Sequence, residues 1–195
     1  MRWIVLVLIS GLTFGTYWFQ DFFSGMKGLM ESQMGFTSEE FGRLIGLTTI
    51  ANMFGMIIIG GMILDKLGIR RTGFMFVFFM AFGAMLTAYG ASDAYGNGGP
   101  AYTFMSSFWP NYSPELKMML LGRFFYGLGA ETSIVVVSKI LVKWFKGKDL
   151  ALAFGLKVGF GRLGSFLALR LSPALAHFTH FLWSETLFIT LFLLF

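Results

Sequence analysis

Long apolar segments alternate with short polar ones along the chain. Six apolar segments can be traced, at residues 3–23, 44–64, 72–89, 117–142, 151–174 and 181–195. A helix needs about 20 mostly apolar residues to cross the hydrocarbon core of a bilayer. The pattern therefore predicts an all-α integral membrane protein, a single bundle of six transmembrane helices over residues 1–195.

The first and last segments bear on processing and length. The first segment begins at Trp3 and lacks the small residues of a signal-peptide cleavage site, so we expect it to be retained as a span. Residues 183–195 make about 20 Å of helix, against a core of roughly 30 Å. We expect the chain to stop inside its sixth span, either as a piece of a longer protein or as a half-sized protein that depends on a partner.

The polar breaks predict where the turns and loops lie. Residues 27–43 include Thr37 and Ser38, either of which would cap the following helix. The longest break, residues 91–115, contains a Gly-Asn-Gly-Gly-Pro run that is typical of a loop. We expect this loop to lie outside the membrane.

Composition supports the membrane class and removes several kinds of chemistry. Only 13% of residues are charged, against roughly 25% in an ordinary soluble domain. The chain has no cysteine, which excludes disulfides, thiol catalysis and thiolate metal sites. In a membrane protein the net charge of +5 matters less than where the charges lie, and we expect no nucleic-acid partner.

The loop charges fall unevenly on the two sides of the predicted bundle. One side carries Asp65, Asp149 and eight basic residues, namely Arg2, Lys66, Arg70, Arg71, Lys139, Lys143, Lys146 and Lys148. The other side carries three basic and seven acidic residues, namely Lys27, Arg43, Lys117, Asp21, Glu31, Glu39, Glu40, Asp93, Glu115 and Glu185. Because Lys and Arg in short loops mark the cytoplasmic side, we expect the first side to be cytoplasmic, or the matrix side in a mitochondrion, and the 91–115 loop to be lumenal or external.

The turn between the second and third segments carries a distinctive pattern. Residues 61–71 read Gly-Met-Ile-Leu-Asp-Lys-Leu-Gly-Ile-Arg-Arg. The pattern resembles the signature of the major facilitator superfamily, which occupies this same turn. Ile69 departs from it, since many members carry a basic residue there. The matching positions are Gly61, Asp65, Lys66, Gly68, Arg70 and Arg71.

A second pattern lies in the fourth segment. Residues 123–130 read Arg-Phe-Phe-Tyr-Gly-Leu-Gly-Ala and resemble the fourth-helix motif of the same family. Residues 144–148 and 154–165 resemble, more narrowly, the group of major facilitator superfamily domain-containing protein 1.

These resemblances imply a fold and a function. They imply the N-terminal half of a secondary transporter with alternating access, in which the solute binds between two halves of the protein. Within the family the signature turn latches the halves together, and its Asp faces a helix N-terminus of the other half, where an anion is favoured. The narrower group implies an amino-acid or dipeptide-like solute and a lysosome-like endomembrane, with the mitochondrial inner membrane and the plasma membrane as other candidates.

Five ionisable residues fall inside the predicted spans, namely Arg123, Glu131, Lys157, Arg162 and Arg170. A lipid-exposed charge at mid-bilayer costs about 2.5 kcal/mol or more, so we expect each of them to face the bundle interior or water. Counted from the nearest span end, Glu131 lies about 21 Å from the external side and Lys157 about 9 Å from the cytoplasmic side. Since these depths coincide in a core of roughly 30 Å, we predict an ion pair between Glu131 and Lys157.

Arg162 and Arg123 are the candidate substrate-binding residues. Helical spacing puts Arg162, near mid-membrane, on one face with Gly155 and Gly159, a small-residue pair that lets a neighbouring helix approach. Arg162 either binds a substrate carboxylate or pairs within the bundle. Arg123 either binds substrate or anchors helix packing through hydrogen bonds, and the second interpretation is favoured.

Two functions remain open on these observations. The first is transport of a small organic solute by half of a secondary transporter. The second is a transport-inactive half-transporter that serves as a structural subunit of a larger membrane complex. We find no nucleophile–base pair, phosphate-binding loop or metal-ligand cluster, and so expect neither enzyme activity nor a cofactor or metal. The expected partners are the lipid bilayer, the solute, and a C-terminal transporter half or other membrane subunits.

Overall fold

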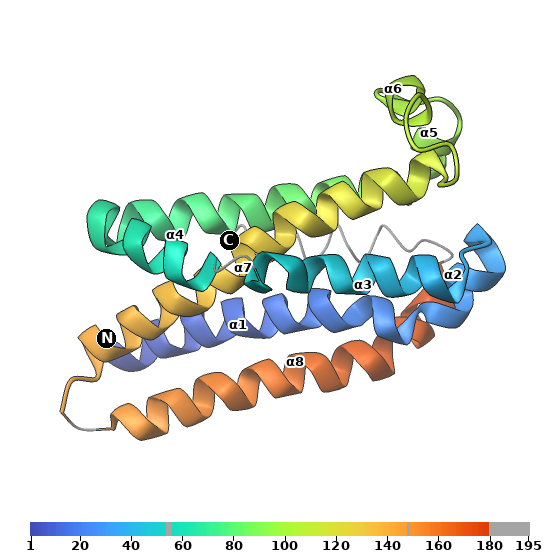
Figure 1. Cartoon of the computed structure of the whole chain (residues 1–195). Helices are drawn as coiled ribbons and strands as arrows, with labels where there is room; N and C mark the ends of the chain where they lie inside the picture. The colour runs from blue at the N-terminus through green and yellow to red at the C-terminus, as the bar shows by residue number, and fades with distance from the viewer. Residues whose placement is uncertain (54–55, 148, 180–195) are drawn as a thin grey trace.

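The computed structural model describes residues 1–53, 56–147 and 149–179, and this part of the chain contains helices and no strand (Figure 1). The helices are α1 (Arg2–Gly25), α2 (Lys27–Met34), α3 (Ser38–Met53), α4 (Met56–Gly90), α5 (Asp93–Gly96), α6 (Tyr102–Ser106), α7 (Pro114–Trp144) and α8 (Leu150–Thr179). The expected sixth span, residues 181–195, lies outside the described residues.

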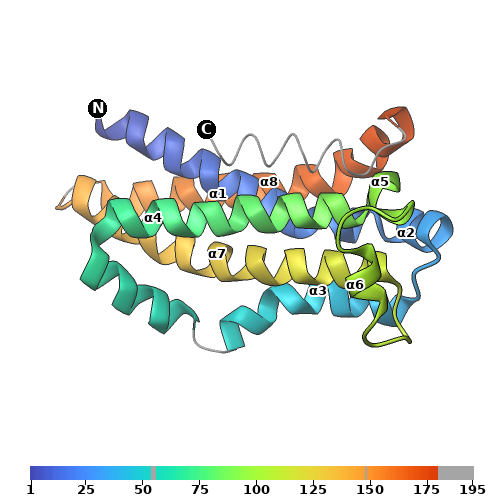
Figure 2. The ribbon, with the colours of Figure 1, turned by 90° about the horizontal axis from the view of Figure 1, so that it is seen from above.

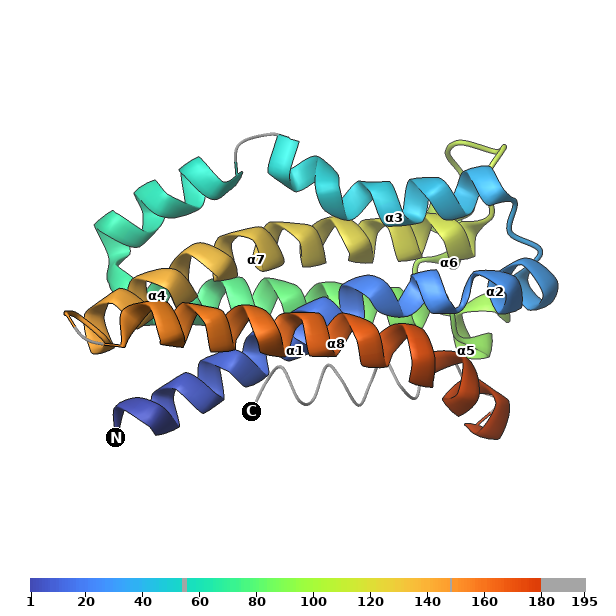
Figure 3. The same ribbon diagram turned by 90° about the horizontal axis from the view of Figure 1, so that it is seen from below.

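The long helices run side by side as a bundle. α4 and α3 pack along α7, and α1 packs along α8, as the views from above and below also show (Figures 2 and 3). Within the described residues, four helices are long and apolar enough to cross a membrane: α1, α4, α7 and residues 150–174 of α8. The prediction of an all-helical membrane protein is confirmed in this coarser form, whereas six spans remain a prediction.

The turn between the second and third apolar segments lies within α4. Residues 44–64 fall partly on α3 and partly on the start of α4, and residues 72–89 form the rest of α4. Between these parts of α4 the chain turns at Gly68, which has φ 78° and ψ 167°. Only glycine adopts this backbone conformation without strain. The signature pattern therefore requires a glycine at position 68 for its backbone conformation. Space is not the reason, because no described atom lies within 4 Å of a Cβ built on Gly68.

The basic loops gather at one end of the bundle. The N-terminus, the Gly68 turn and the α7–α8 connection all lie at the end drawn on the left of Figure 1. Two ion pairs join these segments, from Arg2 to Asp149 (3.0 Å) and from Lys139 to Asp65 (2.5 Å). At the opposite end Thr37 caps α3, because its backbone N–H donates to Glu40 while its hydroxyl accepts from the Glu40 N–H. The ends thus separate as the charge pattern predicts, and the assignment of the basic end to the cytoplasm stays a prediction.

Candidate functional site

The fourth-helix motif places α7 close to two neighbouring helices. A Cβ built on Gly127 would lie 2.6 Å from the carbonyl oxygen of Thr48 on α3. A Cβ built on Gly129 would collide with the backbone of Phe76 on α4. Small residues at such contacts let helix backbones approach closely in a membrane protein, so the two motif glycines fit α7 between α3 and α4.

Arg123, at the head of the same motif, ties α7 to α1 and α3. Its side chain is fully buried. The guanidinium donates to the carbonyl oxygens of Leu44 (3.3 Å), Phe19 (3.3 Å) and Gln20 (3.4 Å). It also lies 4.7 Å from the ring centroid of Phe23, a cation–π distance. With its donors engaged by backbone carbonyls, Arg123 has the surroundings of a packing anchor.

Lys157 and Glu131 are not brought together as an ion pair. The Lys157 ammonium group, which is largely buried, donates to the hydroxyl of Ser138 on α7 at 3.3 Å. Ser138 lies seven residues from Glu131, about 10 Å along the helix axis. The depth count placed Glu131 too close to the α7–α8 connection, because α7 has 31 residues, about 46 Å of helix, and its depth was counted across a core of roughly 30 Å.

The Lys157–Ser138 hydrogen bond, which fixes how far α8 is shifted along α7, also brings Arg162 to nearly the same height along the bundle as Glu131. Arg162 is five residues beyond Lys157, about 7.5 Å farther from the α7–α8 connection, and so lies within about one helical turn of the level of Glu131. Its guanidinium lies 5.9 Å from the ring centroid of Tyr17 on α1. Glu131 is half-buried and Arg162 is exposed, and among the described ion pairs neither one takes part.

Two other glycines, Gly161 and Gly164, hold α8 against α1. A Cβ on Gly161 would meet the Tyr17 ring at 2.9 Å, and a Cβ on Gly164 would lie 2.5 Å from the carbonyl oxygen of Phe14. By contrast, no described atom lies within 4 Å of a Cβ on Gly155 or Gly159. The expected close contact at these two positions is therefore not made by the described helices, and none of the described residues covers this face of α8 at the two glycines.

Hydroxyl groups that the sequence did not single out line the space between α1 and α7. A cavity of about 10 Å³ is bordered by Thr13, Thr16, Tyr17 and Ser133, among others, which is room for about one water molecule. The phenol of Tyr126 donates to the Thr16 carbonyl at 2.6 Å. The sequence signal that could have identified these residues is the presence of hydroxyl side chains inside apolar segments. Such side chains are also common where helices simply pack together, so the signal is not specific.

The signature turn forms a second polar region, at the basic end. Asp65 and Lys139 border a groove of about 360 Å³ that Gly61 and Ser138 also line. Lys66, Arg70 and Arg71 are exposed, and none of them appears in a described ion pair. Over the described residues, no group of three His, Cys, Asp or Glu side chains could hold a metal ion.

Comparison with known proteins gives a consistent set of relatives, all named lysosomal dipeptide transporter MFSD1. The chain is 30% identical to the Danio rerio protein over 165 residues, which is 84% of this chain and 31% of the relative. It is 29% identical to the Homo sapiens protein over 171 residues, 87% of this chain and 32% of the relative. With the Gallus gallus protein it shares 46% identity over 48 residues, 25% of this chain and 11% of the relative.

The extent of these matches sets the scale of the similarity. The chain spans about a third of the length of the curated relatives it matches. No family model matches it, and no solved structure matches it. The relatives are named as transporters and not as enzymes, and with the four membrane-length helices they support a multi-pass protein of a lysosome-like membrane. The resemblance expected from the two motifs is confirmed, and the chain is a homologue, over most of its length, of the MFSD1 transporters of the major facilitator superfamily.

Proposed function

We propose that this chain is one half of a secondary transporter that carries a small zwitterionic solute, such as a dipeptide, by alternating access. The observation that carries the proposal is the placement of Arg162 and Glu131 at nearly one level of the bundle, with no described ion pair to either. The named activity of the relatives, dipeptide transport, fits a site with one positive and one negative group.

The two side chains match the two ends of a zwitterion. A guanidinium binds a carboxylate through two parallel, charge-assisted hydrogen bonds, and Glu131 offers an acceptor for an ammonium group. Each charge is costly to keep inside a membrane without a partner. A solute that supplies both opposite charges lowers the cost of both groups, whereas a singly charged solute lowers only one of the two costs and a neutral solute lowers neither.

Alternating access requires a second body beside this one. The chain matches about a third of its relatives, and the α8 face that carries Gly155 and Gly159 has no described neighbour. We assign this face and the Arg162 side chain to a cavity completed by a C-terminal transporter half or by partner membrane subunits. A binding site between two halves at mid-membrane is the common arrangement in such transporters.

Uptake by the intact protein in reconstituted vesicles tests the proposal. We expect a dipeptide with free termini to be taken up at least tenfold faster than its N-acetylated and C-amidated forms, because each blocked form loses one charge-assisted contact worth about 1.5–3 kcal/mol. Equal uptake of all three forms would contradict zwitterion recognition. Absence of uptake for every solute, in protein that is folded, would favour the transport-inactive structural subunit instead.

We also propose that Asp65 acts in a latch at the basic end. Asp65→Asn is expected to shift the populations of inward-open and outward-open states with less than about 1 kcal/mol lost in stability, because its pair with Lys139 is exposed. The measurement is the accessibility to thiol reagents of single cysteines placed at each end of this cysteine-free chain. Lys139→Asp combined with Asp65→Lys restores the pair but not the anion at position 65, so a shift that persists in this double variant assigns the latch to the Asp65 charge and not to the pair. An unchanged accessibility pattern in Asp65→Asn would exclude the latch.

A further inference from the structure

The loop between α4 and α7 is held in a fixed shape by a buried lysine. Lys117, near the start of α7, is 6% exposed. Its ammonium group donates to the carbonyl oxygens of Met105 (2.7 Å) and Phe108 (2.6 Å). These acceptors lie at and just beyond the end of α6, where helix carbonyls lack partners within the helix, so Lys117 fixes the position of α6 on α7.

Aromatic packing reinforces this loop from the inside. Tyr95 of α5 is fully buried and makes edge-on contacts with Tyr89 and Tyr102, at centroid distances of 5.1 and 5.5 Å. Met105 and Met118 belong to the same buried cluster. The loop therefore has a small core of its own next to the bundle.

Three aromatic side chains of this ordered loop are exposed. Phe104 is 66% exposed, Phe108 37% and Trp109 68%. They stack edge-on in sequence, with centroid distances of 5.3 Å from Phe104 to Phe108 and 6.2 Å from Phe108 to Trp109. We call these three residues the aromatic platform.

The residues around the platform have the composition of a segment that lies at the membrane–water interface. Residues 101–112 contain no Lys, Arg, Asp or Glu, and their polar side chains are hydroxyls and one amide. Trp and Tyr are enriched where a membrane meets water, because an aromatic ring has an apolar body and its polar groups reach the headgroups. A binding surface for a charged protein partner would be expected to include charged groups at its rim.

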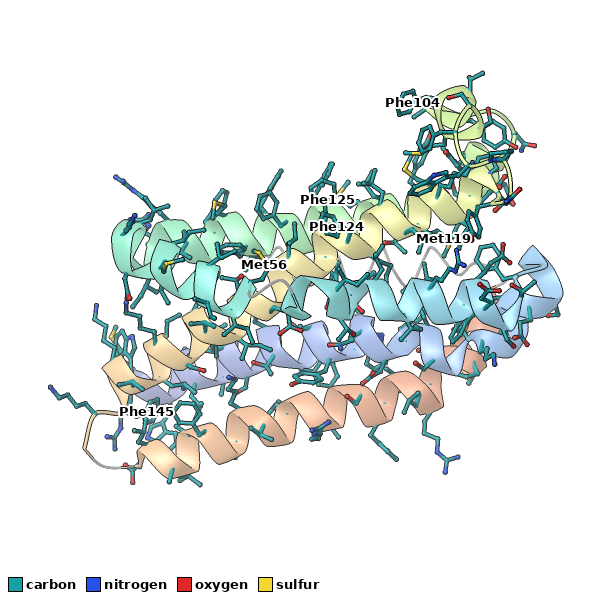
Figure 4. All side chains as sticks on the ribbon, in the orientation of Figure 1. Met56, Phe104, Met119, Phe124, Phe125 and Phe145 are labelled. Carbon is teal, nitrogen blue, oxygen red and sulfur yellow. The ribbon has the colours of Figure 1, made fainter. Side chains whose placement is uncertain are left out.

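The position of the platform points to the same surface. α6 lies beside the end of the bundle opposite the basic loops (Figure 1). Phe104 lies on the side of the bundle that also carries Phe125 (Figure 4). Phe125 stacks on Phe82 of α4 at 5.4 Å, and Phe82 and Phe78 are themselves exposed along that helix. An apolar surface suited to lipid thus continues from the membrane-crossing helices toward the platform.

From these observations we infer that the aromatic platform of Phe104, Phe108 and Trp109 inserts into the lipid headgroup region at this end of the bundle, with Lys117 as its positioning residue. The part of the loop that carries the platform, residues 101–113, then rests on the membrane surface and is not free in the aqueous compartment. This role is independent of the solute and of the proposed site at Arg162.

Fluorescence of Trp109 tests the inference. The intact protein, with every other tryptophan changed to phenylalanine, is reconstituted in phosphatidylcholine vesicles with and without lipids brominated near the headgroup. We expect brominated lipid to quench at least half of the Trp109 emission and iodide to quench little of it. As a matched reporter, Ala94→Trp, at an exposed position of α5, combined with Trp109→Phe, is expected to show the reverse.

Two variants of the Trp109 reporter separate insertion from folding. Phe104→Ser is expected to reduce the lipid quenching about twofold or more while dipeptide uptake and thermal stability stay unchanged. Lys117→Met is expected to reduce the quenching similarly with all three aromatic residues present. Full iodide access to Trp109 without lipid quenching would overturn the inference and would turn attention to a protein partner for the platform.

Discussion

Arg162→Lys is expected to lower dipeptide uptake about tenfold or more while the protein still inserts and folds. A lysine keeps the charge but presents a single ammonium group, so it cannot reproduce two parallel bonds to a carboxylate. The loss of about 1.5–3 kcal/mol of charge-assisted hydrogen bonding corresponds to roughly 10–100-fold in binding. The structural surroundings of Arg162 give little reason for a loss of stability, because its side chain is exposed and its described contact is with the Tyr17 ring.

The measurement is uptake in reconstituted vesicles together with the midpoint of thermal unfolding for each variant. Arg170→Lys is a matched control, since Arg170 is an exposed arginine on the same helix and should tolerate the change. Full uptake by Arg162→Ala would eliminate the binding role. Lower stability without a change in affinity would instead indicate that Arg162 pairs within the bundle.

Arg123→Leu is expected to destabilise the protein by about 3 kcal/mol or more. The change removes three hydrogen bonds from a charged donor, each worth about 1.5–3 kcal/mol in favourable cases and less in membrane proteins, and it removes the cation–π contact with Phe23. Arg123→Lys should fall between Leu and wild type, because one ammonium group cannot reach acceptors on both α1 and α3 in the same geometry.

Thermal unfolding in lipid nanodiscs measures this effect. Arg43→Leu is the control, because Arg43 makes an exposed pair with Glu39 at 2.6 Å and such pairs contribute at most about 1 kcal/mol. If Arg123→Leu lost uptake but kept the stability of the wild type, Arg123 would be assigned to substrate binding. That outcome would contradict the role as a packing anchor.

Much of the architecture was accessible from the sequence because apolar length and local patterns determine it. The segments at 3–23, 117–142 and 151–174 lie within α1, α7 and α8, and the glycine of the signature turn lies at the point where α4 reverses. Gly68 is informative because its requirement is local, a positive φ that other residues avoid.

The relations between helices were harder to predict. The Glu131–Lys157 pair was inferred from depth alone, whereas the register is set by close contacts of Gly161 and Gly164 and by the hydroxyl of Ser138. These contacts join residues far apart in the chain, and no spacing rule within one helix reveals them.

The attachments of α7 have a consequence for how the protein moves. α7 touches α3 and α4 where no side chain fits, at Gly127 and Gly129, and Arg123 bonds it to carbonyls of α1 and α3. Sliding any of these helices along α7 would break several of these contacts at once, which is costly in a close-packed interior. We therefore expect α1, α3, α4 and α7 to move together as one rigid body, with α8 held on α1 by the close contacts at Gly161 and Gly164. The alternation of access that we propose would then take place at the boundary of this body and not within it.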